Sequence, residues 1–392
     1  MGALDGIRVI EAGLLVQGPQ AAVTLGDWGA DVVKVELPGF GDQSRWLPIA
    51  PTDPRSAYFT ACNRGKRSVT IDLRTRNGCE AFLRLSETVD VIITNFKPGT
   101  MDEWGLGYEA VAARNPRIVY AAGSTFGLVG PDAHREGADL SAQAAGGLIS
   151  TTGRDGAEPT PVAITIADHI ASLNLVSGIV AALFARERTG RGQRIDTSLL
   201  GGQIWAQASE YTACLLSGSS AGRSNRGHPM IPGLYGIFST ADGSIAIVGV
   251  VGSARALFFE TIGRPDLAAR FGQIFYWNEQ KAELFPILDE VFATKTTAEW
   301  SVILGQAGLR FAPVRSHADV VADPAVWANG YLAEADGPDG SVRVVANPVR
   351  FSDTPSRLGA IAPELGQHTE EVLLERGFTW DDIAELRSAS AI

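Results

Sequence analysis

The chain has 392 residues, of which 45% are hydrophobic and 20% are charged, and its formal net charge is −11. A chain of this length and composition can bury a sizeable core and ordinarily divides into two domains. The negative charge argues against nucleic acid or an anionic membrane as the main partner, because both attract basic surfaces.

Strand-like and helical segments alternate along the first third of the chain. Strands are predicted over residues 7–11, 31–35, 68–73, 90–96 and 117–121, and helices over 21–28 and 78–85. This alternation favours parallel strands joined by crossover helices. Ligands of such sheets bind at the carboxyl ends of the strands, where Gln17, Asn95, Phe96 and Lys97 are expected.

No Gly-x-Gly-x-x-Gly loop follows the first predicted strand, and no Gly-Lys-Ser/Thr phosphate loop occurs in the sequence. The sheet is therefore expected to resemble a dinucleotide-binding fold without its fingerprint. A basic cluster of Arg64, Lys66 and Arg67 offers another way to bind phosphate, since Lys and Arg pair well with phosphate oxygens. The other interpretation of this cluster is an ordinary solvated loop.

Asp168 interrupts an apolar stretch, residues 161–172, where a helix over about 170–187 is predicted to begin. In one interpretation Asp168 caps that helix by accepting N–H bonds of the first turn. In the other, these N–H groups and the helix dipole keep the carboxylate ionised, so that it acts as a nucleophile and forms a covalent acyl intermediate. His169 is expected to be structural or to line a pocket, because adjacent helical residues do not face each other.

The pattern changes after residue 190. A strand is predicted over 191–196, a helix over 199–216 and a Gly/Ser-rich linker over 217–228. Residues 236–248 predict a hairpin with an Asp-Gly turn. Helices are predicted over 254–262, 281–292 and 297–307, and the tail has a predicted strand over 340–351 and helix over 366–373.

Three cysteines, Cys62, Cys79 and Cys214, lack metal-ligand spacing, and no charged-then-apolar leader opens the chain. A reduced, cytoplasmic location is therefore expected, with each thiol a small buried residue and no metal site. No run of about 18 uninterrupted apolar residues predicts a membrane span.

Ordered motifs along nearly the whole chain resemble the class III CoA-transferases, the family of formyl-CoA transferase and the carnitine CoA-transferases. The matching segments include residues 4–11, 17–19, 25–36, 63–68, 95–99, 143–148, 152–153, 168 and 186–193. The resemblance implies an α/β fold with a Rossmann-like large domain, a smaller α+β domain and an interlocked homodimer. The expected bounds are 1–216 for the large CoA-binding domain, 217–228 for the linker, 229–325 for the small domain and 326–392 for a segment that returns to the large domain.

The resemblance also implies an activity, the transfer of CoA from a donor acyl-CoA to a small carboxylic acid. Asp168 aligns with the aspartate that carries the acyl-aspartyl and aspartyl-CoA intermediates. CoA is then a substrate, and no tightly bound cofactor is expected. Oxyanions form in each step, and Gln17 and the backbone near Gly146 and Gly147 are the candidates to donate hydrogen bonds to them.

A CoA site is implied by the same resemblance. Its expected residues are Val16, Gln17, Leu73, Arg74, Asn95, Phe96, Lys97 and Asp139. Asp139 aligns with an acidic residue near the nucleophile, and its other interpretation is a turn or cap residue. Glu103 and Glu136 stand where formyl-CoA transferase has basic contacts, so the nucleotide is expected to be held differently.

Two alternatives remain beside CoA transfer. An α-methylacyl-CoA racemase needs two acid/base groups, and the His of the racemase motif is missing from Gly137-Ala138-Asp139. A non-catalytic acyl-CoA-binding paralogue would keep the CoA site without using Asp168. Arg223, Arg226 and His228 are the candidates to meet an acceptor carboxylate.

Overall fold

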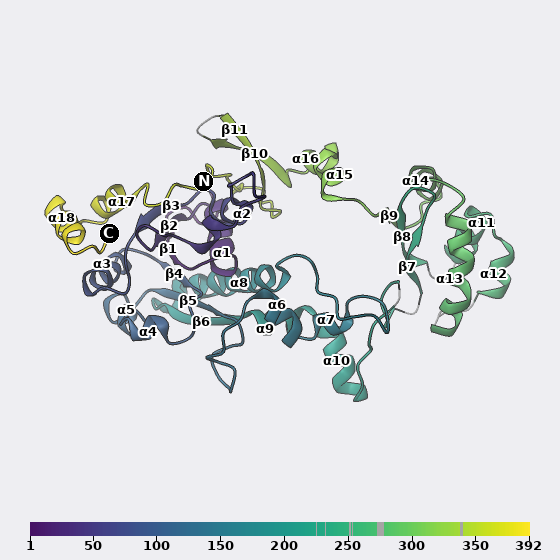
Figure 1. The fold of residues 1–392 in the computed structure, drawn as a ribbon, viewed down its shortest axis with the longest axis horizontal. Helices are drawn as coiled ribbons and strands as arrows, with labels where there is room; N and C mark the ends of the chain where they lie inside the picture. The colour runs from purple at the N-terminus through teal and green to yellow at the C-terminus, as the bar shows by residue number, and fades with distance from the viewer. Residues whose placement is uncertain (225, 232, 251, 253, 273–277, 338–339) are drawn as a thin grey trace. The chain divides into compact units, whose positions relative to one another are not determined.

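The computed structural model describes residues 1–392 except 225, 232, 251, 253, 273–277 and 338–339 (Figure 1). The chain forms two compact units. Unit 1 consists of Met1–Gly147, Val162–Gln207 and Pro324–Ile392, and unit 2 of Leu148–Pro161 and Ala208–Asp323. The division predicted from the sequence placed residues 148–161 and 208–216 in the large domain instead. Asn225 of the predicted linker lies outside the described residues, as do 232, 251, 253 and 273–277 of the predicted small domain and 338–339 of the predicted return segment.

The sheet of unit 1 has six parallel strands in the order β3-β2-β1-β4-β5-β6. They are β1 (Arg8–Ala12), β2 (Asp31–Glu36), β3 (Arg67–Thr70), β4 (Val91–Thr94), β5 (Val119–Ser124) and β6 (Gln193–Ser198). The strand order reverses between β1 and β4, and such a switch point leaves a crevice at the carboxyl ends of the strands. The predicted α/β, Rossmann-like fold is confirmed.

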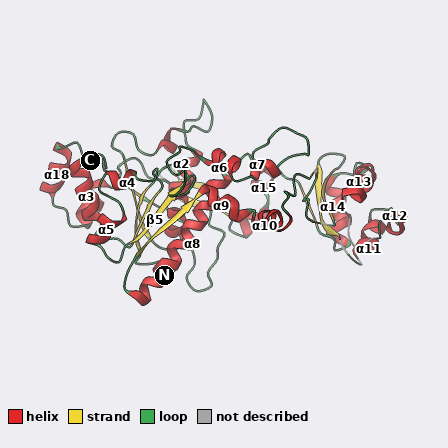
Figure 2. Cartoon of the chain, turned by 90° about the horizontal axis from the view of Figure 1, so that it is seen from below, coloured by secondary structure: helices red, strands yellow, loops and turns green. Residues whose placement is uncertain are grey.

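Helices cover both faces of this sheet, as the apolar strands require. On one face, α1 (Gln17–Asp27) and α8 (Ile166–Thr189) pack against Val9, Val91 and Val119, and Figure 2 shows α8 beside the sheet. The opposite face, with Ile10 and Ile92, is covered by α3 (Arg76–Ser86), α5 (Tyr108–Arg114), α17 (Thr369–Glu375) and α18 (Trp380–Ser388). Successive strand residues thus contribute to two separate cores.

The remaining elements of unit 1 are short. They are η1 (Gln43–Trp46), α2 (Ala57–Asn63), α4 (Thr100–Glu103), α6 (Asp139–Ala145), α9 (Leu199–Ala206), α16 (Pro324–Ala328) and the antiparallel pair β10 (Leu332–Gly337) and β11 (Gly340–Val345). The tail continues along β3, where His368 N donates to Ser68 O at 2.9 Å. The C-terminal segment is therefore part of unit 1 through backbone bonds as well as apolar packing.

Among the described residues, α8 is the one helix long and apolar enough to cross a membrane. Leu175, Ile179 and Ala182 are buried in the core of unit 1. A helix that is packed on a sheet in this way is a core helix, and its composition follows from that position.

Unit 2 contains an antiparallel sheet of β7 (Leu234–Ser239), β8 (Ser244–Val250) and β9 (Phe311–Pro313). The predicted hairpin is confirmed, with the turn closed by Thr240 N and Gly243 O at 2.9 Å. A core that includes Phe238, Phe258, Phe292 and Trp300 lies against it. The helices are α7 (Leu148–Thr151), α10 (Ala208–Ser217), α11 (Ala254–Thr261), α12 (Asp266–Arg270), α13 (Asn278–Phe292), α14 (Thr297–Gln306) and α15 (His317–Ala322).

Three predicted helices differ clearly from the structure. α1 begins at Gln17, four residues before the predicted start at residue 21. α8 begins at Ile166, four residues before the predicted start at residue 170. The single helix predicted over 199–216 is two helices, α9 and α10, which are separated at Gln207. The side chain of Gln207 donates to Gly146 O at 2.7 Å and to Gln203 O at 2.9 Å, and these tertiary and local bonds accompany the break.

Candidate active site

The loops after β1 and β4 meet at the switch point of the sheet. The side chain of Asn95, just after β4, accepts a hydrogen bond from Leu14 N at 2.8 Å and donates one to Leu14 O at 2.8 Å. Because Leu14 lies in the loop between β1 and α1, the amide joins the two loops. This is the edge of the sheet at which ligands of such folds bind.

Buried charged side chains hold the rest of the β1–α1 loop. Glu11 accepts from Gly13 N at 2.7 Å, Lys34 donates to Gly13 O at 3.1 Å, and Asp42 accepts from Leu15 N at 3.1 Å. Leu15 has a φ of 64°, a left-handed conformation that costs a non-glycine residue roughly 1–2 kcal/mol. The charged side chains therefore keep the loop in a shape that its own residues disfavour.

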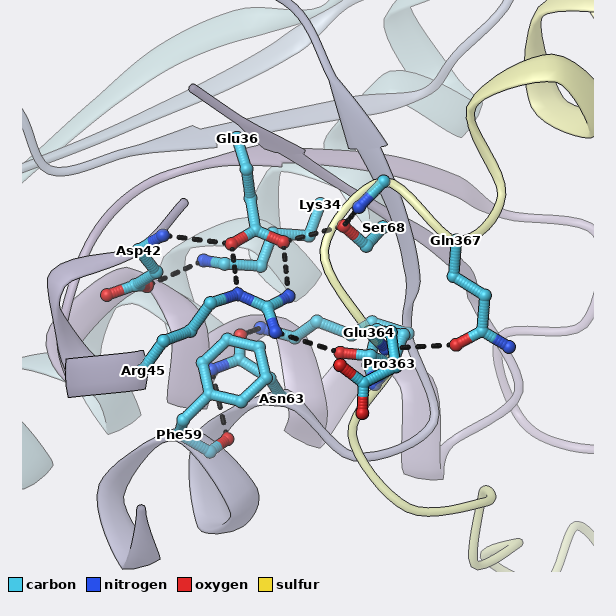
Figure 3. A network of polar contacts seen from close by, with 12 residues as sticks. Lys34, Glu36, Asp42, Arg45, Phe59, Asn63, Ser68, Pro363, Glu364 and Gln367 are labelled. Carbon is cyan, nitrogen blue, oxygen red and sulfur yellow. Dashed lines mark hydrogen bonds and ion pairs between the residues drawn. The ribbon is translucent and has the colours of Figure 1, made fainter. Parts of the chain in front are cut away.

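The same network reaches the C-terminal segment (Figure 3). Glu36 accepts hydrogen bonds from Arg45 at 2.7 Å, from Ser68 Oγ at 2.7 Å and from Asp42 N at 2.9 Å. Arg45 also donates to Pro363 O at 3.1 Å. The carboxyl ends of β2 and β3 are thus tied to the segment that follows the β10–β11 pair.

Two lysines of the network are buried and paired. Lys34 lies 3.0 Å from Glu11 and 2.8 Å from Asp42. Burial alone would lower the pKa of Lys34, but the surrounding carboxylates outweigh burial and raise it. Lys66 donates to Glu11 at 3.0 Å and to Pro19 O at 2.9 Å, and burial lowers its pKa to about 8. Buried charges are stable only when paired in this way.

An apolar pocket of about 230 Å³ lies at the carboxyl ends of β1 to β4. It brings together Leu73, Arg74 and Phe96, three residues predicted for the CoA site, with Leu14 and Trp104. The rings of Phe96 and Trp104 meet edge to face with centroids 5.3 Å apart. A flat, weakly polar group such as a nucleobase fits walls of this kind.

Gln17 begins α1 directly after the β1–α1 loop. Val16 precedes it without a side-chain cap, so the first-turn N–H groups of α1 are not satisfied by a capping side chain. Gln17 is only 3% exposed, and its Nε2 has no hydrogen-bond partner among the described residues. A buried amide donor without an acceptor is costly, and it is therefore available to a ligand oxygen.

Asp168 lies in the first turn of α8, which is preceded by Thr165 as the N-cap. The prediction that Asp168 caps this helix is wrong, because the helix begins before it. Its carboxylate has no side-chain hydrogen bond among the described residues. Burial, followed by the nearby charge of Asp139, raises the pKa of Asp168 from 3.8 to about 7. Burial thus disfavours the ionised form of Asp168, which the helix dipole was expected to favour.

Asp139 supplies the cap that Asp168 was expected to provide. Its Oδ1 accepts from Ala167 N at 2.7 Å and from Asp168 N at 3.2 Å, and its Oδ2 accepts from Gln143 Nε2 at 2.6 Å. The carboxylate is 8% exposed. Asp139 thus stays next to Asp168 as a fixed, hydrogen-bonded neighbour, 29 residues earlier in the chain.

His169 and Cys62 are the other titratable groups close to Asp168. His169 Nδ1 contacts Gln20 Oε1 on α1, and burial lowers the pKa of the imidazole. Burial raises the pKa of the Cys62 thiol to about 11. Both side chains are therefore neutral at pH 7, which leaves Asp168 as the group of this set that titrates there.

Gly146 and Gly147 end α6. Gly146 N donates to Ala142 O at 2.8 Å and Gly147 N to Ala144 O at 3.4 Å. A side chain at position 146 would collide with Gln203, since its Cβ would lie 2.5 Å from Gln203 Cβ. Gly146 thus allows close packing, and the N–H groups of both glycines are engaged, which argues against their expected role as oxyanion donors.

The residues of the basic cluster, Arg64, Lys66 and Arg67, form ion pairs with acidic residues of unit 1. Arg64 pairs with Asp27 at 2.6 Å and is buried, as is Lys66. The phosphate-binding prediction is wrong for these two residues, because their charges are enclosed and already paired. Arg67 pairs with Asp31 at 2.7 Å.

Arg74 and Lys97 remain accessible. Arg74 lines the apolar pocket and pairs with Asp72 at 2.7 Å. Lys97 Nζ lies 3.8 Å from Glu136. Because both side chains are exposed, these pairs are weak and can be exchanged for an anionic ligand.

The sequence analysis did not predict that Glu11, Lys34 and Asp42 fix the conformation of the β1–α1 loop. Glu11 and Lys34 stand inside strands whose other residues are mostly apolar. A charged residue in a strand that is buried on both faces was the available signal. Asp42 lies in a loop, where an acidic residue carries no such signal.

Comparison with known proteins identifies the family. Residues 4–369 match CoA-transferase family III. The chain is 35% identical over 389 residues to a succinyl-CoA:mesaconate CoA-transferase of Haloarcula marismortui, covering 96% of this chain and 97% of that protein. It is 35% identical over 385 residues to a succinate–glutarate CoA-transferase of Agrobacterium fabrum, with 95% of each covered.

A solved structure agrees with these relatives. A CaiB/BaiF family protein from Brucella suis superposes with a TM-score of 0.86 at 35% identity, covering 96% of this chain and 99% of that chain. The resemblance in the sequence motifs is confirmed. The chain belongs to CoA-transferase family III and is an enzyme that transfers CoA.

Proposed function

We propose that the enzyme transfers CoA from a dicarboxylic acyl-CoA to a small dicarboxylic acid through covalent intermediates on Asp168. The relatives support this substrate class, since their names pair succinyl-CoA or succinate with mesaconate and glutarate. The observation that carries the proposal is the half-buried Asp168 carboxylate, whose pKa burial raises to about 7. A poorly hydrated carboxylate is a stronger nucleophile than a solvated one.

The proposed reaction has four balanced steps. The Asp168 carboxylate attacks the thioester carbonyl of the donor, which forms an acyl-aspartyl anhydride and releases CoA thiolate. The thiolate attacks the Asp168 carbonyl, giving an aspartyl-CoA thioester and the donor acid as a carboxylate. The acceptor carboxylate attacks this thioester and releases the thiolate again. In the last step the thiolate attacks the acceptor's acyl carbonyl, so that the new acyl-CoA leaves and Asp168 is regenerated.

Trapping tests the covalent intermediates. After incubation with succinyl-CoA, hydroxylamine is expected to convert aspartyl-CoA into a hydroxamate at Asp168, which peptide mass spectrometry detects. Asp168→Asn is the control and should yield no adduct. CoA binding without any adduct or turnover would instead support a non-catalytic CoA-binding protein.

Gln17 is proposed to donate its free Nε2–H to the oxyanion of each step. We expect Gln17→Leu to lower kcat about 10²-fold, the usual loss for one such donor. Gly123→Ala should act in the same direction, because a Cβ there would lie 2.4 Å from Gln17 Oε1. Steady-state kinetics measures both, with the exposed Gln367→Leu as the control; a kcat within twofold of wild type for Gln17→Leu would contradict the role.

The apolar pocket is proposed to hold the adenine of CoA, with Arg74 beside it for a phosphate. Trp104→Ala removes one aromatic wall and is expected to weaken CoA binding about 10-fold, as base–aromatic stacking contributes about 1–3 kcal/mol. Calorimetric titration with CoA measures this change. The control is Trp380→Ala on α18, which is 59% exposed, and equal CoA affinity of the two variants would place the adenine elsewhere.

A homodimer is proposed because apolar side chains project from α8 and α9. Leu173, Val180 and Phe184 share one face of α8 at spacings of seven and four, and are 61%, 37% and 62% exposed, while Trp205 on α9 is 74% exposed. Phe184→Glu is expected to shift the protein from dimer to monomer in light scattering. The control is Val129→Glu in an exposed loop, and a monomeric wild type would refute the dimer.

A further inference from the structure

Two helices of unit 1 carry the two groups of the proposed reaction. Gln17 opens α1, and Asp168 lies in the first turn of α8. The apolar core that these helices share begins further along both of them, at Ala21 on α1 and at Leu175 on α8. The two first turns therefore lie beyond that core, and their spacing depends on other contacts.

A hydrogen bond joins the helices at this end. His169 Nδ1 on α8 contacts Gln20 Oε1 on α1. Among the described residues this is the one side-chain hydrogen bond between α1 and α8. Gln20 lies three residues after Gln17, so the two are neighbours on the surface of α1. His169 directly follows Asp168 in α8. The contact is thus close to both groups along the chain.

Thr165 holds the other side of the imidazole ring. The Oε1 atom of Gln20 can only accept, so Nδ1 of His169 carries the proton. Nε2 of the neutral ring then accepts from Thr165 Oγ1 at 3.3 Å. Burial lowers the pKa of His169, which favours this neutral form. Thr165 is the N-cap residue of α8, but its side chain makes no capping bond. Its hydroxyl is therefore used to orient the ring.

We infer that the hydrogen bond between Gln20 and His169 is a positioning device for Asp168. It sets the spacing of this carboxylate from the amide of Gln17. The inference rests on the proposed function, in which one group attacks a thioester carbonyl and the other donates to the oxyanion that forms. Both must reach the same carbonyl, and a displacement of about 1 Å can lower a rate by about 10²-fold. His169 and Gln20 act through the two helices and need not touch the substrate.

Replacement of either side chain tests the inference. His169→Leu and Gln20→Leu are each expected to lower kcat at least about 10-fold and to leave the KM for succinyl-CoA within about twofold. The double variant should lose no more than either single variant, because both changes remove the same bond. His169→Asn should retain most of the activity, since its Nδ2 takes the position of Nδ1 and donates in its place.

The rates are expressed per CoA-binding site, counted by calorimetric titration, so that unfolded protein does not lower them. His134→Leu, which removes an exposed histidine of unit 1, is the matched control. A kcat within about twofold of wild type for His169→Leu would overturn the inference, as would losses that multiply in the double variant. A His169→Asn protein no more active than His169→Leu would overturn it as well.

NMR keeps this inference separate from the proposed function. Long-range proton–nitrogen spectra of protein labelled at its histidines show which ring nitrogen carries the proton, and the His169 signal is identified by its loss in His169→Leu. We expect a neutral ring protonated on Nδ1, with a changed Nδ1 shift in Gln20→Leu. An unchanged shift would overturn the inference whatever the role of Asp168. Activity that survives Asp168→Asn would instead refute the nucleophile, and the NMR result would still show whether the two helices are joined.

Discussion

Asp168→Asn is expected to lower kcat for CoA transfer by about 10⁴-fold or more, while CoA still binds with wild-type affinity. The amide has nearly the same shape as the carboxylate but cannot form the anhydride, and removal of a covalent nucleophile has effects of this size. Succinyl-CoA with glutarate is the assay. Turnover within 10-fold of wild type by a folded Asp168→Asn protein would refute the nucleophile.

The pH dependence of the wild-type enzyme gives an independent test of the same residue. The proposed nucleophile is the ionised form, and the pKa of Asp168 is raised to about 7. We therefore expect kcat/KM to rise between about pH 6 and pH 8 and to level above that range. Asp139, His169 and Cys62 face the same region. Burial lowers the pKa of His169 from its ordinary value and raises that of Cys62 to about 11, so both shifts are away from the value of Asp168.

The same substitution is expected to stabilise the fold at neutral pH. A carboxyl group whose pKa is higher in the folded than in the unfolded protein contributes to stability at low pH, where it is protonated. This contribution is lost as the pH rises through the pKa of the folded state. Asp168→Asn removes the cost of the buried charge, which amounts to about 2–4 kcal/mol. Urea denaturation should therefore show a larger gain at pH 8 than at pH 5. An equal gain at both pH values would contradict the raised pKa.

Lys34→Met is expected to lower the free energy of unfolding by about 3–5 kcal/mol, because it leaves Asp42 buried without its cation and Glu11 with Lys66 alone. The loop through Leu15 would lose its support as well, so CoA binding should weaken together with stability. Urea denaturation and calorimetry measure the two effects.

Lys97→Met is the matched control, because Lys97 is exposed and lies 3.8 Å from its partner. If Lys34→Met is too unstable to purify, Asp42→Asn keeps the shape of the side chain and removes only its charge. A loss of less than about 1 kcal/mol in both variants would show that the network contributes little to stability.

The sequence predicted the fold well because both faces of the sheet leave a local signature. Residues such as Val9 and Ile10 are both buried, one in each core, and produce the short apolar runs from which parallel strands were predicted. The start of α8 was misplaced because its cap is Asp139, a residue on another helix. A cap formed through tertiary contact leaves no pattern in the local sequence.

Only part of the candidate site was predicted correctly, again because some features depend on tertiary contacts. Asn95 and Phe96 follow a buried strand, which marks the ligand edge of the sheet. Arg64 and Lys66 resemble an exposed basic loop in sequence, yet they are 5% and 4% exposed because Asp27 and Glu11 pair with them. Only the folded chain brings those partners within reach.

The racemase alternative receives no support from this arrangement. Asp139 accepts three hydrogen bonds in capping α8 and holding Gln143, so it is occupied as an acceptor. The two relatives described above are named as CoA-transferases.

The burial of Asp168, together with the neighbouring carboxylate of Asp139, has a consequence for the direction of the proposed chemistry. With a pKa near 7, Asp168 departs from an anhydride less readily than a dicarboxylic acid, whose pKa is near 4. When CoA thiolate meets the anhydride in the proposed cycle, the substrate acid is therefore the preferred leaving group. A buried carboxylate beside a second acidic side chain would thus favour transfer of the coenzyme to the enzyme over its return to the donor.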